Sequence, residues 1–111
     1  MHKREDLKKQ SRLKLFGSAK KDFDAIISMI INKYGPKRIV QWGSLLDAEQ
    51  FDYNSDIDIA VEGIVDASKY FALLGDAMEL TRFPLDIVQL EKIEPEFVEL
   101  ILSKGKIIYE S

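Results

Sequence analysis

The chain has 111 residues, a formal net charge of −3 and no cysteine, which predicts one domain and excludes disulfides, thiolate catalysis and cysteine-based zinc sites. Its only histidine is His2, so histidine general-base catalysis is not expected, and any metal should be a hard cation with oxygen ligands, such as magnesium. No apolar run reaches the roughly 20 residues that a membrane span needs, and no apolar segment follows the charged start, so we expect a cytoplasmic protein.

The beginning of the chain carries most of its positive charge. Residues 1–21 hold eight of the sixteen Lys and Arg against two acids, which makes this segment about +6 and the remainder about −9. Residues 1–17 are predicted to be a basic N-terminal arm or a short helix that Gly17 and Ser18 break, with the domain at residues 18–111. We favour a solvated helix, and the alternative is an arm that docks on an acidic protein surface or on RNA. The acidic remainder argues against direct nucleic-acid binding by the domain itself.

The pattern of apolar residues predicts alternating helices and strands. In chain order we expect a helix over 18–34, a strand over 38–42, a short helix over 45–50, a strand over 56–62, a helix over 66–80, a strand over 85–90, a helix from Pro95 and a strand over 106–109. The helix over 66–80 should bury Met78, among others, and the helix from Pro95 should bury Phe97, Leu100 and Ile101. The expected fold is therefore a single small α/β (α+β) domain, a mixed sheet of about four strands covered by helices.

Three aspartates lie on the predicted second and third strands. Asp56 and Asp58 are two residues apart, so they should project from one face of a strand, and Asp86 interrupts the otherwise apolar segment 84–88. Side-by-side carboxylates repel each other unless a divalent cation lies between them. A simple strand start beside a polar loop is the alternative for the first two aspartates, but it leaves Asp86 unexplained. A calcium loop is rejected, because Ile57 occupies the position that requires glycine.

A Gly-Ser pair follows the first predicted strand directly. Gly43 lets the backbone approach an anion closely, and backbone amides together with the Ser44 hydroxyl would bind phosphate oxygens. By itself a Gly-Ser pair usually indicates only a turn. The Asp-x-Asp strand that follows is what makes a phosphate-binding role a useful hypothesis.

Together, Gly43-Ser44, Asp56-Ile57-Asp58 and Asp86 resemble the signature of the DNA polymerase beta-like nucleotidyltransferase superfamily, and in particular the minimal nucleotidyltransferases (MNT). This resemblance implies that Gly43 and Ser44 hold the β- and γ-phosphates of a nucleoside triphosphate, with ATP expected. It implies that Asp56 and Asp58 bind two Mg²⁺ ions, with Mn²⁺ as a possible substitute, and that Asp86 binds one ion and helps to activate the attacking hydroxyl. It further implies an antitoxin that transfers AMP to a HEPN-type helical toxin.

The segment Leu45–Glu49 departs from that signature. The family usually has a small residue, an arginine and a glycine there, whereas this chain has Asp47 and Glu49 and no basic residue. Added negative charge weakens the attraction for a triphosphate. Lys37, Arg38 and Arg82 are candidates for a compensating charge, and the favoured alternative for each is a solvated surface position. The alternative function is a catalytically weak binding module that neutralises its partner by occlusion, and an RNA-binding accessory domain is a third, less favoured, hypothesis.

Overall fold

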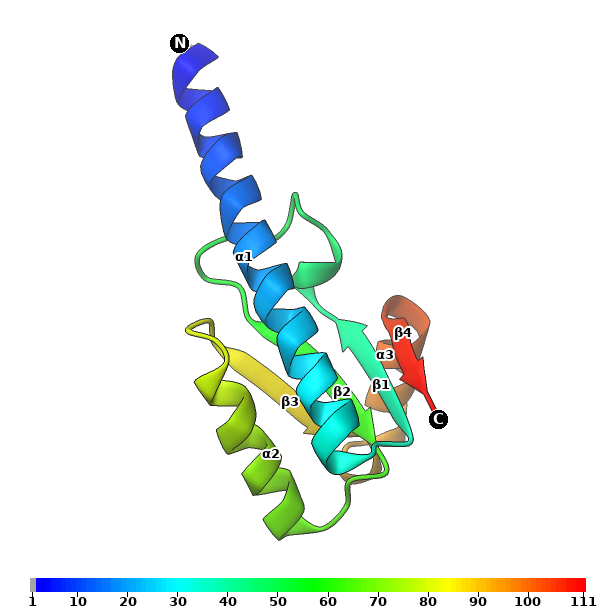
Figure 1. Ribbon diagram of the computed structural model, residues 1–111. Helices are drawn as coiled ribbons and strands as arrows, with labels where there is room; N and C mark the ends of the chain where they lie inside the picture. Colours follow the sequence, from blue (N-terminus) through cyan, green and yellow to red (C-terminus); the bar gives the residue numbers. More distant parts are fainter. Residues whose placement is uncertain (1) are drawn as a thin grey trace.

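The structure is a computed structural model that describes the backbone of residues 2–111 and the side chains of residues 8–111, so the His2 side chain lies outside the described part. The elements follow the order α1 (His2–Tyr34), β1 (Arg38–Trp42), η1 (Ser44–Leu46), β2 (Ile57–Glu62), α2 (Ala67–Glu79), β3 (Leu85–Gln89), η2 (Leu90–Lys92), α3 (Pro95–Lys104) and β4 (Lys106–Glu110) (Figure 1). The short helix expected over 45–50 is thus a single 3₁₀ turn, η1. Within the described residues, no helix is long and apolar enough to cross a membrane.

The four strands form one mixed sheet in the order β3-β2-β1-β4. Strand β1 is antiparallel to both of its neighbours, whereas β2 and β3 run parallel and are joined by α2. A parallel pair needs such a crossover, since a tight turn cannot return the chain to the same end. The predicted fold class is confirmed.

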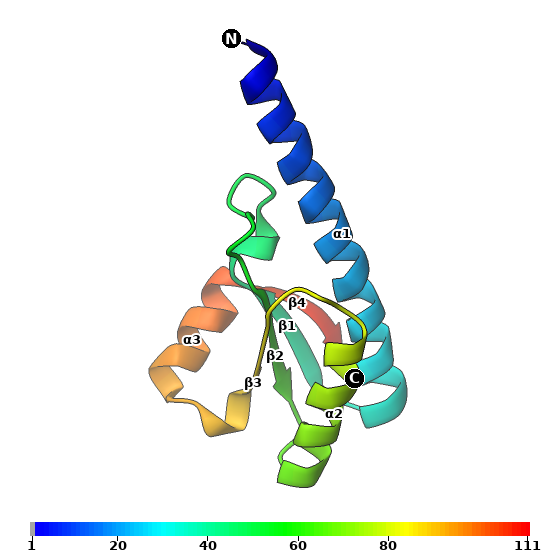
Figure 2. The same ribbon diagram turned by 90° about the vertical axis from the view of Figure 1, so that its left-hand side faces the viewer.

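Helices cover both faces of the sheet, with α1 and α2 on one face and α3 on the other (Figure 2). The larger core lies under α1 and α2, where Ile57, Ile59 and Val61 of β2 are fully buried. Ala60 belongs to the smaller cluster under α3. Because neighbouring residues of a strand point to opposite faces, Asp58 lies on the α3 face.

Helix α1 is continuous through Gly17 and Ser18, so the expected break there is wrong. A glycine inside a helix costs about 1 kcal/mol relative to alanine. Packing on both sides of Gly17 offsets that cost, because Phe16 lies against the core and Ala19 is fully buried. The first half of α1 therefore extends as a helix beyond the sheet (Figure 1).

The helical faces of α2 and α3 bury less than the apolar pattern predicts. Met78 is 65% exposed, and in α3 only Ile101 is buried, while Phe97 and Leu100 are 37% and 45% exposed. Those three expectations are wrong because each helix presents only a narrow stripe to the sheet. The exposed side chains of α3 instead line a cavity described below.

Candidate functional site

The topology gathers the predicted site at one end of the sheet. Strand β1 ends at Trp42, and the antiparallel register places Asp58, near the start of β2, opposite it. Strand β3 runs parallel to β2, and its register pairs Asp58 with Asp86. Trp42, Asp58 and Asp86 therefore follow one another across three adjacent strands, and Gly43 comes directly after Trp42. Both aspartates lie on the α3 face, because their neighbours Ile57, Ile59 and Ile87 are buried under α1 and α2.

Gly43 is required at its position for two reasons. Its φ is 79° and its ψ is −163°, a conformation found essentially only in glycine. A Cβ atom added there would overlap Asp58 Oδ2 and would lie 2.8 Å from Asp58 Cγ. The backbone of the turn is thus packed directly against the carboxylate, and only a residue without a side chain permits this approach.

The chain after Gly43 is held as a tight turn. The Leu46 amide donates to the Gly43 carbonyl at 3.2 Å, and the Asp47 amide donates to the Ser44 carbonyl at 3.2 Å. Leu45 is buried, and its carbonyl accepts a bond from the buried Gln41 side chain at 3.4 Å. Leu45 and Gln41 therefore fix the turn to the buried core. Ser44 is half-buried and follows β1.

Asp58 carries the clearest electrostatic signal of the site. Burial raises the pKa of its carboxyl group to about 7, and the charges of Asp86 and then Asp56 add to the effect. Desolvation and neighbouring negative charge both disfavour the ionised form. Among the described side chains, no Lys or Arg forms an ion pair with Asp58. The three aspartates thus form a site of concentrated negative charge.

The donor chemistry of these aspartates fits a hard divalent cation. Carboxylate oxygens are the preferred protein ligands of magnesium, which usually takes further ligands from water and phosphates. A divalent cation bound there would offset the negative charge of the three neighbouring carboxylates. Asp56 and Asp58 are half-buried, and Asp86 is exposed. Within the described residues, no three acidic or histidine side chains are already placed as a metal-binding cluster.

Tyr70 supports the strand that carries Asp86 from the opposite face of the sheet. Its hydroxyl donates a hydrogen bond of 2.6 Å to the Ile87 carbonyl. Burial raises the pKa of Tyr70, and the Asp86 charge raises it further. Nothing in the helical pattern of residues 66–80 indicates this role of the Tyr70 hydroxyl.

The segment between the turn and Asp56 is an ordered loop. Phe51 is fully buried, with ring centroids 6.1 Å from Phe16 and 5.8 Å from Phe83. Asp52 closes a turn by accepting from the Asn54 amide at 2.9 Å, as aspartate commonly does. Arg12 of α1 donates to the Glu49 carbonyl at 3.1 Å. The N-terminal half of α1 therefore contacts the loop beside the site.

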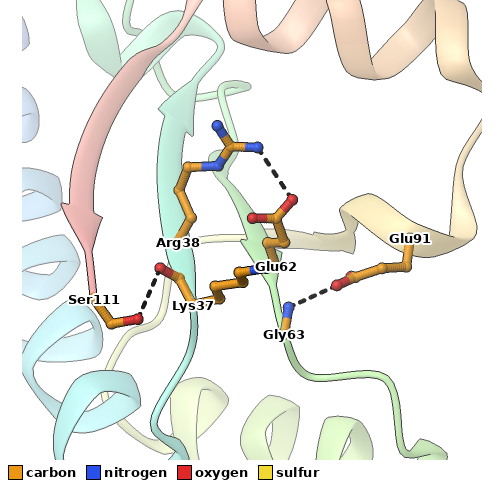
Figure 3. Close-up of polar contacts among 6 residues, drawn as sticks. All are labelled: Lys37, Arg38, Glu62, Gly63, Glu91 and Ser111. Atoms are coloured by element: carbon orange, nitrogen blue, oxygen red, sulfur yellow. Dashed lines mark hydrogen bonds and ion pairs between the residues drawn. The ribbon is translucent and has the colours of Figure 1, made fainter.

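Lys37 and Arg38, two of the three candidates for a compensating charge, lie at the end of the sheet opposite Gly43. Arg38 begins β1, at the opposite end of the strand from Gly43, and pairs with Glu62 at 3.1 Å (Figure 3). Lys37 precedes it, and its main chain bonds to Glu62 and Ser111. Arg82 lies exposed between α2 and β3.

Sequence reasoning overlooked a cavity on the other side of the turn. It measures about 410 Å³, and Lys104 at the end of α3 lines it together with Gly43 and Ser44. The rings of Trp42 and Phe97 meet edge to face at 5.7 Å in its wall. Phe97 and Leu100 are the sequence feature that could have indicated this cavity. Both are large apolar residues of α3 that line it and do not belong to the buried core.

Comparison with known proteins identifies the same type of fold. A family model described as "Polymerase beta, Nucleotidyltransferase" matches residues 24–111. A search of the curated proteins finds no match. Among solved structures, the chain is similar to a toxin–antitoxin complex named MntA-HepT, with 20% identity, a TM-score of 0.63, and 83% of this chain and 73% of that chain covered. It is also similar to a toxin–antitoxin structure with AMP-PNP, with 24% identity, a TM-score of 0.63, and 78% and 73% covered. At these identities the likeness concerns the fold.

Proposed function

We propose that this chain, which belongs to the Polymerase beta nucleotidyltransferase family, transfers a nucleoside monophosphate from a nucleoside triphosphate to a hydroxyl group of a partner protein. The observation that carries the proposal is the row formed by Gly43, directly after β1, and by Asp58 and Asp86 on the neighbouring strands β2 and β3. A phosphate-binding turn and metal-binding carboxylates are the two parts that phosphoryl transfer requires.

The partner in this proposal is a toxin. The structural neighbours are toxin–antitoxin assemblies, and one of them contains AMP-PNP. By analogy with these neighbours, the proposed protein is an antitoxin that uses ATP. The HEPN-type helical class of the toxin is taken from the resemblance to the minimal nucleotidyltransferases. A physical argument supports a protein acceptor. The site lies at the surface of a single small domain, so a second surface must position the attacking hydroxyl.

Each residue of the site has a distinct task in the proposed reaction. The Gly43–Ser44 turn binds the β- and γ-phosphates through its backbone and the Ser44 hydroxyl. Asp56, Asp58 and Asp86 hold magnesium, which when bound offsets their charge and stabilises the transferring phosphoryl group. The acceptor oxygen forms a bond to the α-phosphorus while the bond to the bridging oxygen of the β-phosphate breaks, and pyrophosphate leaves. Asp86, the exposed member, accepts the proton of the hydroxyl.

One observation favours a second function, that of a binding module. Asp47 and Glu49 stand where a basic residue is expected, and both are exposed beside the turn. Negative charge there opposes triphosphate binding. A chain of this kind would neutralise a toxin by covering its active surface, without chemistry.

Labelled transfer separates the two functions. The protein is incubated with magnesium, α-labelled ATP and the protein encoded beside its gene, and label on that neighbour is measured. The enzyme hypothesis predicts labelling that Asp58→Asn abolishes. Asp66→Asn is the matched control, because Asp66 is exposed and its side chain caps no helix amide. Tight complex formation and neutralisation without label would instead support occlusion, and absence of both would refute both functions.

A further inference from the structure

The proposed triphosphate site needs a positive charge that its own turn does not provide. Residues 45–49 contain two acids and no Lys or Arg. Arg38 is paired with Glu62 at the far end of β1. Arg12 donates to a carbonyl of the loop through its guanidinium. The question is which described cation can reach a phosphate bound at Gly43 and Ser44.

The pairing of β1 with β4 brings Lys104 to the turn. Strand β4 is antiparallel to β1, with Gln41 opposite Lys106. Lys104, the last residue of α3, lies two residues before Lys106 and lines the same cavity as Gly43. Gly43 and Lys104, 61 positions apart in the chain, therefore meet at the same end of the sheet.

Gly105 fixes this arrangement by its close packing. A Cβ atom at Gly105 would lie 2.5 Å from the Ile101 carbonyl oxygen and 2.7 Å from the Gln41 carbonyl oxygen. Its amide donates to Ile101 at 2.7 Å. The end of α3 is thus held against the last residues of β1, and the backbone of Lys104 has little freedom to move away from the turn.

The cavity beside the turn leaves room for a ligand next to Lys104. It measures about 410 Å³ and is lined by Gly43, Ser44 and Lys104 together with the Trp42–Phe97 pair. Lys104 is exposed and, among the described side chains, forms no ion pair. Asp47 also lines the cavity, but one of its carboxylate oxygens already accepts from the Glu49 amide at 2.9 Å.

We propose that Lys104 binds the terminal phosphates of the triphosphate held at Gly43 and Ser44, and so replaces the basic residue missing from the turn. The order of the strands gives the direction of the ligand. Asp86, Asp58 and Gly43 lie on β3, β2 and the end of β1, and Lys104 lies beyond them next to β4. The α-phosphate would lie at the aspartates and the β- and γ-phosphates would extend toward Lys104. This inference rests on the proposed function.

A lysine in the last turn of a helix also stabilises the helix dipole, so the test must separate phosphate binding from that structural role. Affinity for AMP-PNP and for AMP, each with magnesium, is measured by calorimetry. AMP has no β- or γ-phosphate, so it reports on the site without the proposed contact. Lys104→Ala removes the charge, Lys104→Arg retains it, and Lys106→Ala is the matched control, because Lys106 is an exposed lysine two residues away that does not line the cavity.

Lys104→Ala is expected to weaken AMP-PNP binding about tenfold or more, the usual scale for a lost hydrogen bond to a charged group. AMP binding should stay unchanged, Lys104→Arg should recover most of the affinity, and Lys106→Ala should match the wild type. An equal loss for both ligands, or no loss, overturns the assignment of Lys104. Failure of the wild type to bind AMP-PNP at all overturns the proposed function as well, so the two failures are distinguishable.

Discussion

The Cα of Gly43 lies directly against the carboxylate of Asp58, so closely that a Cβ atom at Gly43 would lie 3.0 Å from Asp58 Cβ and overlap the carboxylate oxygen. The turn and the acidic site are therefore one packed unit, although fourteen residues separate them in the chain. A change in either part must affect the other.

Gly43→Ala should lower stability by about 1–3 kcal/mol, because alanine is strained at this φ and its methyl group displaces Asp58. Nucleotide binding should be lost with it. Urea unfolding measures the first effect and calorimetry the second. Asp58→Ala in the same chain should recover the part of the loss that comes from collision, as a double-mutant cycle would reveal. Gly75→Ala is the control, because Gly75 lies inside α2 where an added Cβ meets nothing within 4 Å, and this change should stabilise the protein slightly. Equal effects at both glycines would contradict the packed-unit interpretation.

Asp58→Asn should stabilise the metal-free protein above pH 7 and leave it unchanged near pH 4. The folded-state pKa of Asp58 is raised to about 7 from an ordinary value of 3.8. The stabilising contribution of the protonated carboxyl is full below the unfolded value and is lost as the pH rises through the folded value. Asparagine does not titrate, so the variant avoids this loss. We expect a gain on the order of 1 kcal/mol, since Asp58 is only half-buried and solvent screens its charge.

Urea unfolding at pH 4, 6 and 8 with a chelator present measures this dependence. A variant that is less stable than the wild type at pH 8 would show that the Asp58 carboxylate is structural, and the metal-site assignment would then lose its support.

Gly17→Ala should stabilise the protein by up to about 1 kcal/mol, the difference in helix propensity between the two residues. The position lies inside α1, and an added Cβ meets nothing within 4 Å. Gly105→Ala should have the opposite effect, because its Cβ would collide with two carbonyl oxygens. Thermal unfolding of the two variants provides the comparison. An unchanged Tm for Gly17→Ala would indicate that the helix is interrupted there after all.

Reversing the charge of Lys8 and Lys9 should slow association with the proposed partner and make the rate less dependent on salt. Both residues line a cavity of about 570 Å³ between α1 and the loop at Ala48 and Glu49. Deleting residues 1–17 is a poorer test, because it also removes Phe16 from its contact with Phe51. Surface plasmon resonance at two salt concentrations gives the rates, with Lys33 and its partner Asp76 exchanged as a charge-neutral control. Unchanged rates would refute the docking role of the basic arm.

The sequence alone predicted the order of the strands, the α-helices between them and the fold class, but not the continuity of α1 or the 3₁₀ turn η2. Period-two and helical patterns are local properties, and the bounds of β1 were predicted to the residue. Local pattern also selected the candidate site residues: Asp56 and Asp58 by their spacing along a strand, Asp86 as a charge in an apolar segment, and Gly43 and Ser44 as a turn directly after a strand.

Only the tertiary structure decided what lies next to these residues. The helix continues through Gly17 because Phe16 and Ala19 pack against the core. Helix propensity carries no information about that packing. The exposure of Phe97 and Leu100 depended on how much of α3 the sheet covers. The sequence also did not indicate which cations lie near the site. Arg38 is at the end of β1 opposite Gly43, whereas the pairing of β1 with β4 places Lys104 beside the turn. Contacts between distant segments follow from strand register and close packing, and local sequence patterns predict neither of these.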